Sequence, residues 1–271
     1  MIIGELDIVL NDVDTSLITD MSRLFQYKDN FNQPICNWDT GNVTNMCCMF
    51  YEAYSFNQPL NWDTGNVTNM SLMFYGASSF NQPLTFDTGN VTNMDSMFVG
   101  ASLFNQSLNW NTGNVTSMNG MFNFANSFNQ PLNWDTRNVT NMSYMFFEAS
   151  SFNQPLTWDT GNVTNMYCMF RKASLFNQPL NWDTGNVTDM SGMFWEASLF
   201  DQNLLNKERE KWAFVETQYL GNCKKLPTEL IKLISQFAFV PWNMKNVANT
   251  KDMFAGCPSL VYVNKFKKMK N

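Results

Sequence analysis

The 271-residue chain contains no histidine, and charged residues make up only 15% of it. Without histidine the chain lacks the commonest general base and the commonest metal ligand, which disfavours most hydrolase and zinc-enzyme mechanisms. No apolar run approaches the roughly 20 residues that a membrane-spanning helix needs. The opening residues, MIIGELDIVLNDVD, place no Lys or Arg before their apolar stretch and do not fit a secretory signal peptide. These absences disfavour both histidine-dependent catalysis and a membrane span.

Cysteine is present but is not arranged as a metal site. No two cysteines form a C-x-x-C pair, and no histidine is available to complete a mixed zinc site. The sequence also offers no nucleophile–base arrangement and no G-x-x-x-x-G-K phosphate loop. We therefore expect no catalytic residue, no metal and no cofactor, and we expect free thiols that pack as small apolar groups in a reducing compartment. The six cysteines are Cys36, Cys47, Cys48, Cys168, Cys223 and Cys257.

Charge is distributed unevenly along the chain. Residues 1–206 carry a net charge of −13 and residues 207–271 a net charge of +7, which together give the formal −6. The end of the chain, residues 265–271, is rich in lysine, and a basic tail can contact an acidic partner, a nucleic acid or a membrane surface. Such runs are more often solvated chain ends, so we expect no nucleic-acid binding.

Aromatic residues reach 15% of the chain, and an internal repeat sets their spacing. The phrase FNQPLNWDTGNVTNMSLMFYGASS, which starts at Phe56, recurs with a period of 24 residues. Degenerate copies at residues 14–25 and 242–254 keep the same register, which makes about nine units. A stacked array has atypical end units because each of them has only one neighbour. The leading Phe falls at positions 31, 56, 80, 104, 128, 152, 176 and 200.

Two periodicities lie inside each unit. Leu60 and Trp62 alternate with polar residues, which predicts a short strand. The DTGN segment that follows, residues 63–66, predicts a tight turn capped by the Asp63 carboxylate. Residues 70–77 then place apolar side chains at i, i+3, i+4 and i+7, the pattern of a short amphipathic helix. The side chains expected to face inward are Leu60, Trp62, Val67, Met70, Met73, Phe74, Ala77 and Phe80.

One unit of this length cannot bury such a face alone, so neighbouring units must stack and each column of like residues must become a ladder. The sequence thus predicts an α/β fold, a leucine-rich-repeat-like solenoid of about nine coils, each a short strand plus a short helix. Its expected parts are a solenoid with a degenerate N-terminal cap (1–206), a helical insertion (207–240), and a last repeat with a basic tail (241–271). The insertion contains an amphipathic helical pattern over residues 226–237.

The phrase FNQPLNWDTGNVTNM, with the M-x-x-M-F columns that follow, resembles the BspA-like leucine-rich repeats of bacterial surface proteins and Mycoplasma-type surface lipoproteins. The resemblance covers residues 31–205 strongly and residues 13–30 and 241–260 more weakly. It implies a solenoid of the leucine-rich-repeat kind and a non-enzymatic role in surface display, adhesion or interaction. The bacterial proteins have a signal peptide, a lipobox cysteine and a wall anchor, and from this sequence we expect none of the three here. We therefore expect a cytoplasmic or virion location rather than a cell-surface one.

Polar columns accompany the apolar ones. A row of carboxylates at Asp63 and its equivalents suggests calcium binding, but Asn111 fills the same slot without a charge, so we expect each Asp to cap its own turn. The Asn66 column is expected to form a hydrogen-bonded ladder. Thr64 and Thr68 would suit an ice- or glycan-binding face only if both pointed outward from one strand, which the intervening turn disfavours.

Comparison among the units indicates where partner specificity resides. Strand and turn positions barely change from unit to unit, whereas the two slots after each Met-Phe pair vary and include aromatic and Arg side chains. Such side chains are enriched in interface hot spots. We therefore predict that a protein partner is bound by Tyr51, Phe147, Arg171 and Trp195. The alternative is that these side chains only pack against the next coil.

The sequence as a whole favours a non-enzymatic scaffold for protein–protein interaction or assembly, for example a structural component of a large virus particle. Two alternatives stay open. One is a cell-surface adhesin that binds a host protein or glycan. The other is a substrate receptor of a ubiquitin ligase, because LPTELIKLISQF (residues 226–237) resembles the opening of an F-box.

Overall fold

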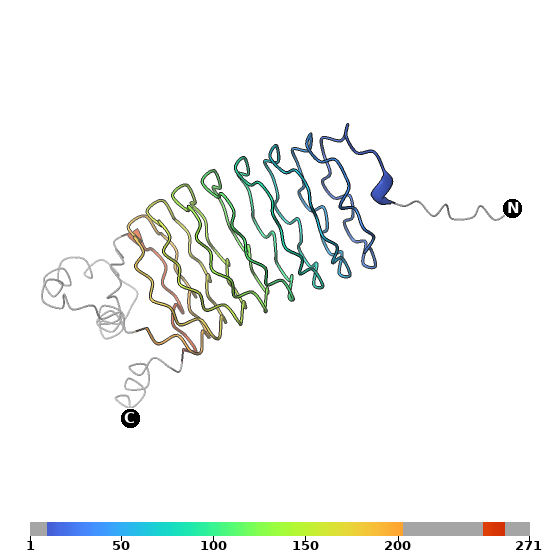
Figure 1. Ribbon diagram of the computed structural model, residues 1–271. Helices are drawn as coiled ribbons and strands as arrows, with labels where there is room; N and C mark the ends of the chain where they lie inside the picture. The colour runs from blue at the N-terminus through green and yellow to red at the C-terminus, as the bar shows by residue number, and fades with distance from the viewer. Residues whose placement is uncertain (1–9, 203–245, 258–271) are drawn as a thin grey trace, which may run out of the picture.

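The computed structural model describes residues 10–202 and 246–257. Within these residues the regular helical structure is one short 3₁₀ helix, η1 (Leu10–Asp12), and the remaining backbone forms turns and isolated parallel bridges. One row of bridges joins residues that are a repeat apart, so successive units lie side by side along the stack (Figure 1). The residues in this row are Asp20, Asn45, Asn69, Asn93, Ser117, Asn141, Asn165, Asp189 and Asn249.

Neighbouring units keep the same alignment even where the number of residues between them changes. The amide Nδ2 of Asn66 donates to the carbonyl of Gly41, 25 residues earlier. The equivalent Asn246 donates to the carbonyl of Gly185, 61 residues earlier, so residues 246–257 form the next rung after residues 186–200. The predicted insertion (207–240) with its F-box-like segment, and most of the basic tail, lie outside the described residues.

The predicted core positions are confirmed. The eight side chains between Leu60 and Phe80 that are expected to face inward are all at most 4% exposed. The rings form continuous columns: measured between ring centroids, Phe74 lies 4.2 Å from Phe80 and 5.6 Å from Phe98, both in the next unit. Rings at such distances contribute more than their buried area alone. The interior is therefore a set of parallel ladders that each unit extends by one rung.

The predicted short helix over residues 70–77 is not formed. An α-helix would direct each N–H to the carbonyl four residues earlier. Here Met73 N–H donates to the carbonyl of Met70, and Phe74 N–H donates to Met97 of the next unit. Leu72 and Gly76 have φ angles of 59° and 70°, which interrupt any right-handed helix. The segment is a chain of tight turns that buries the same i, i+3, i+4, i+7 face, so the apolar spacing alone could not distinguish the two.

Candidate functional site

The variation between units falls on one wall of the stack, which comprises residues 47–52 and the equivalent segments up to 191–196; we term it the variable wall. The Met-Phe pair in the middle of each segment points inward and is fully buried. The flanking residues are held by left-handed turns, such as Glu52 with φ 54°, whose N–H donates to the carbonyl of Tyr75 in the next unit. This backbone fixes the outward side chains in rows along the stack.

Toward the N-terminal end the variable wall carries a row of tyrosines. The ring of Tyr51 lies 4.5 Å from Tyr75 in a parallel stack and 5.4 Å from Tyr27 in an edge arrangement. Burial, together with the neighbouring Tyr75 and Glu52, raises the pKa of Tyr51 to about 12. The Tyr51 ring thus contacts rings of both neighbouring units, Tyr75 covers one of its faces, and the side chain is half-buried.

Toward the C-terminal end, the column that contains Tyr51 places an arginine side chain between two aromatic rings. The guanidinium carbon of Arg171 lies 4.0 Å from the ring centroid of Trp195 and 5.5 Å from that of Phe147, within cation–π range. The Arg171 Nε atom is buried and has no hydrogen-bond partner. All three side chains are half-buried. They pack against adjacent coils, as the alternative interpretation expects, and yet they also reach the surface.

Charged residues flank this arginine and its two rings. The Lys172 ammonium lies 2.8 Å from Oε1 of Glu148, and both side chains are part-exposed. Trp195 Nε1 donates a hydrogen bond of 3.1 Å to Glu196. The Lys172–Glu148 pair joins two neighbouring units across the wall, whereas the Trp195–Glu196 bond lies within one unit. Among the described residues the ion pairs are Arg137–Asp135 and Lys172–Glu148, and neither includes Arg171.

The structure adds rings that the sequence interpretation missed. Phe124 is 41% exposed and lies 5.3 Å from Phe147. Tyr144 lies 5.8 Å from Phe147 and 4.9 Å from Tyr167, and the hydrogen bond with Tyr144 is the main cause of a raised Tyr167 pKa. The structure therefore brings Phe147, Arg171 and Trp195 together with these rings, whereas Tyr51 lies apart, at the other end of the wall. The signal in the sequence was the presence of aromatic residues in columns that hold other, non-aromatic residue types in the remaining units.

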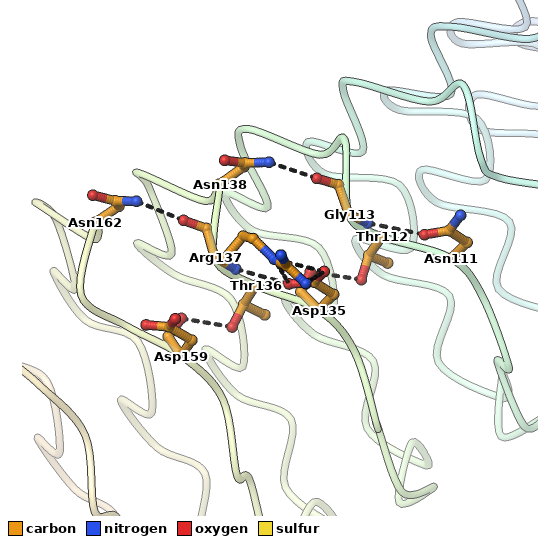
Figure 2. Close-up of polar contacts among 9 residues, drawn as sticks. All are labelled: Asn111, Thr112, Gly113, Asp135, Thr136, Arg137, Asn138, Asp159 and Asn162. Carbon is orange, nitrogen blue, oxygen red and sulfur yellow. Dashed lines mark hydrogen bonds and ion pairs between the residues drawn. The ribbon is translucent and has the colours of Figure 1, made fainter.

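Polar side chains line a second surface of the stack, formed by the DTGN turn at residues 63–66 and its equivalents, which we term the turn face. The Asp column lies on this face (Figure 2). The carboxylate or amide oxygen at each position accepts a hydrogen bond from the backbone of its own turn, as with Gly113 N–H to Asn111 and Arg137 N–H to Asp135. The predicted capping role of the column is thus confirmed. Arg137 also pairs with Asp135 at 2.7 Å, and its side-chain and backbone hydrogen bonds lower the pKa of that carboxyl.

Asn and Thr side chains extend this face into ladders (Figure 2). Asn138 Nδ2 donates to the carbonyl of Gly113 in the preceding unit at 2.7 Å, so the predicted Asn ladder is confirmed. Thr112, the equivalent of Thr64, is buried, and its hydroxyl donates to the carbonyl of Asp135 in the next unit at 2.9 Å. The Thr64 column therefore points inward, and no outward pair of Thr rows exists on this face.

Within residues 10–202 and 246–257, no three Cys, Asp or Glu side chains come together as metal ligands would. In the same part of the chain, no helix combines the length and the apolar character needed to cross a membrane.

Comparison with known proteins identifies one family. A family model described as "Mycoplasma protein of unknown function, DUF285" matches residues 4–86, 84–157 and 132–226. The three matches overlap and together span most of the chain, including every complete repeat. Neither a curated protein nor a solved structure matches the chain.

Proposed function

The chain belongs to the DUF285 family, and we propose that it is a non-enzymatic repeat scaffold that binds a protein partner through the variable wall. The proposal includes the fold class, a BspA-like, leucine-rich-repeat-like solenoid in which chains of turns replace the helices. The continuous row of parallel bridges and the buried ladders support it. The absence of histidine supports the non-enzymatic part of the proposal.

One observation carries the proposal: sequence variation and half-exposed rings occur on the same wall. Phe147, Arg171 and Trp195 form a row of unlike, partly exposed groups in consecutive units. By contrast, the columns that contain Asn66 and Thr68, which lie outside the variable wall, keep the same residue in almost every unit. If every unit presents the same side chains, a partner can bind at any unit equally well. Units with different side chains give the partner one preferred binding position. Buried aromatic and Arg anchors are also the groups that dominate protein interfaces.

The arrangement of the rings favours a protein over a glycan. A sugar ring stacks on the open face of an aromatic side chain. Tyr75 covers one face of Tyr51, and Arg171 covers one face of Trp195. Half-buried rings beside a guanidinium suit the irregular surface of a folded partner or peptide.

The test is a double variant, Phe147→Ser with Trp195→Ser, compared with the wild-type chain in quantitative pull-down mass spectrometry from the native source. We expect the captured amount of the specific partner to fall roughly tenfold or more, because a hot-spot truncation costs about 2 kcal/mol or more. Arg137→Gly on the turn face is the matched control and should retain the partner. Retention of the partner by the double variant, or unfolding of that variant in a thermal melt, would contradict the proposal.

The identity of the captured partner separates the finer forms of this function. A stoichiometric particle protein supports a structural role in a large virus particle, which is the form that the sequence favours. A ubiquitin-ligase scaffold protein would support the substrate-receptor alternative. A host surface protein bound by exported chain would support the adhesin alternative.

A further inference from the structure

Two thiols meet on the variable wall near its N-terminal end. The sulfur atoms of Cys47 and Cys48 lie 3.3 Å apart, although the two residues are adjacent in the sequence. Adjacent residues in an extended strand point to opposite sides. Here the φ angle of Cys48 is 57°, and this left-handed turn places both side chains together. Cys47 is half-buried and Cys48 is 6% exposed, so the pair lies just below the surface with Cys47 on the outer side.

A hydroxyl group of the next unit lies beside the pair. The Ser71 Oγ atom is 3.3 Å from the Cys47 sulfur and 2.8 Å from Oδ1 of Asn69, which accepts its hydrogen bond. Burial is the main cause that raises the pKa of Cys48 to about 11, and the hydrogen bond with Cys47 adds to it, while the nearby Arg23 guanidinium acts in the opposite direction. Both groups are free cysteines in the structure, so the pair places two thiol sulfurs side by side.

Adjacent cysteines are poorly placed for a direct disulfide, but they are well placed to bind one ligand atom between their two sulfurs. Consecutive Cα atoms are about 3.8 Å apart across a trans peptide, which is shorter than the roughly 4.4–6.8 Å that disulfides usually span. A ligand atom that bonds to both sulfurs does not require them to touch. We propose that Cys47 and Cys48 form a dithiol site for a soft, thiophilic electrophile that bonds to two sulfurs, with trivalent arsenic as the chemical class.

The reaction with the probe phenylarsine oxide balances without an oxidant. The more accessible Cys47 sulfur bonds to arsenic first, and the Cys48 sulfur then closes the ring. Two As–S bonds replace the bonds between arsenic and its oxygen. The two thiol protons pass to that oxygen, which leaves as water, and no atom changes oxidation state.

The repeat supplies matched controls for this site. Serine occupies the Cys47 column at Ser71 and Ser143, and it occupies the Cys48 column at Ser96, so Cys47→Ser and Cys48→Ser place a residue that the fold already accepts there. Cys168 is a natural single thiol in the Cys48 column. Its φ angle is 52°, close to that of Cys48, and the neighbouring position holds an aromatic ring instead of a second sulfur.

The test uses the full chain, reduced and then mixed with phenylarsine oxide, with intact-mass spectrometry as the readout. We expect one adduct that survives excess 2-mercaptoethanol and is released by ethanedithiol. Cys47→Ser and Cys48→Ser should each abolish it, and Cys36→Ser should leave it in place. An adduct that persists in either single variant of the pair would overturn the proposal, as would no resistant adduct on the wild-type chain.

A gain-of-function variant tests the geometry itself. Tyr167→Cys places a second thiol beside Cys168, in the two columns that Cys47 and Cys48 occupy. We expect this variant to bind a second equivalent of phenylarsine oxide that resists 2-mercaptoethanol. A single equivalent on folded Tyr167→Cys protein, as judged by its thermal melt, would contradict the claim that these two columns create the site.

Discussion

The indole Nε1 of Trp134 donates a hydrogen bond of 3.0 Å to the backbone carbonyl of Leu108. Trp158 makes the equivalent bond in the next unit. In the same column the Nε1 of Trp110 is buried without a hydrogen-bond partner, and the preceding unit has Phe86 instead of an indole. The chain therefore contains a paired indole, an unpaired indole and a plain ring in nearly identical surroundings.

This column allows the value of one hydrogen bond to be measured. Trp134→Phe and Trp110→Phe remove the same atoms, but only the former leaves a buried carbonyl without its donor. We expect Trp134→Phe to lower the free energy of unfolding by about 1 kcal/mol more than Trp110→Phe does. Urea unfolding followed by circular dichroism provides the comparison. Equal losses would show that the indole bond contributes nothing in this interior.

The ring columns should dominate stability. Phe122 is fully buried, 4.0 Å from Phe128, and stacked on rings of both neighbouring units, so Phe122→Ala should cost about 3–5 kcal/mol. Phe124→Ala, two residues away and 41% exposed, should cost much less. Because each unit contacts only its neighbours, hydrogen exchange should show the loss of protection spreading first from the units beside Phe122. A uniform loss along the stack would argue against this local coupling.

Alkaline unfolding should depend on Tyr51. Its pKa is raised to about 12 in the folded chain, whereas an unfolded tyrosine titrates near pH ~10. The folded state holds the proton more tightly, so this contribution is complete below the unfolded value and is lost as pH rises through about 12. Tyr51→Phe should therefore retain more of its own pH 8 stability at high pH than the wild-type chain does. Circular dichroism across an alkaline titration measures this, and identical curves would contradict it.

The loss of stability at low pH should depend on the Arg137–Asp135 pair of the turn face. Arg137 stands where the other complete units have Gly, and its hydrogen bonds lower the pKa of Asp135. Arg137→Gly should bring that pKa back up toward its usual range, as observed by carboxyl ¹³C NMR. A lowered folded-state pKa stabilises the fold above the unfolded value, and the contribution disappears as pH falls through the lowered value. The variant should thus lose less stability on acidification, with little change at neutral pH because the pair is exposed.

The interior of this molecule could be predicted from sequence because every column repeats. A residue type that recurs at the same place in each unit has the same neighbours above and below, so Val67 and Phe74 could be assigned to the core, where both are fully buried. The local conformation could not be read in the same way. A helix and a chain of turns with left-handed residues bury the same spacing, and the φ angle at Leu72 decides between them.

The candidate sites were less predictable. Choosing one variable slot after each Met-Phe pair found Phe147, Arg171 and Trp195, which do lie together. It missed Tyr144, because Tyr144 lies before its Met-Phe pair and only the slots after each pair were considered. The approach of the two sulfurs at residues 47 and 48 also depends on a left-handed residue that neighbouring units fill with other side chains.

At two contacts between units the number of intervening residues changes, and yet the hydrogen bonds are kept. The bond from Asn57 N–H to Asn32 spans 25 residues, whereas its equivalent in the next unit spans 24. The bond from the Asn246 side chain spans 61 residues. A gene built in this way can gain or lose whole units by recombination between its near-identical copies without disturbing any remaining contact between units. Each new copy starts as a duplicate inside and out, and mutation can then alter its outward side chains while selection preserves the buried ones.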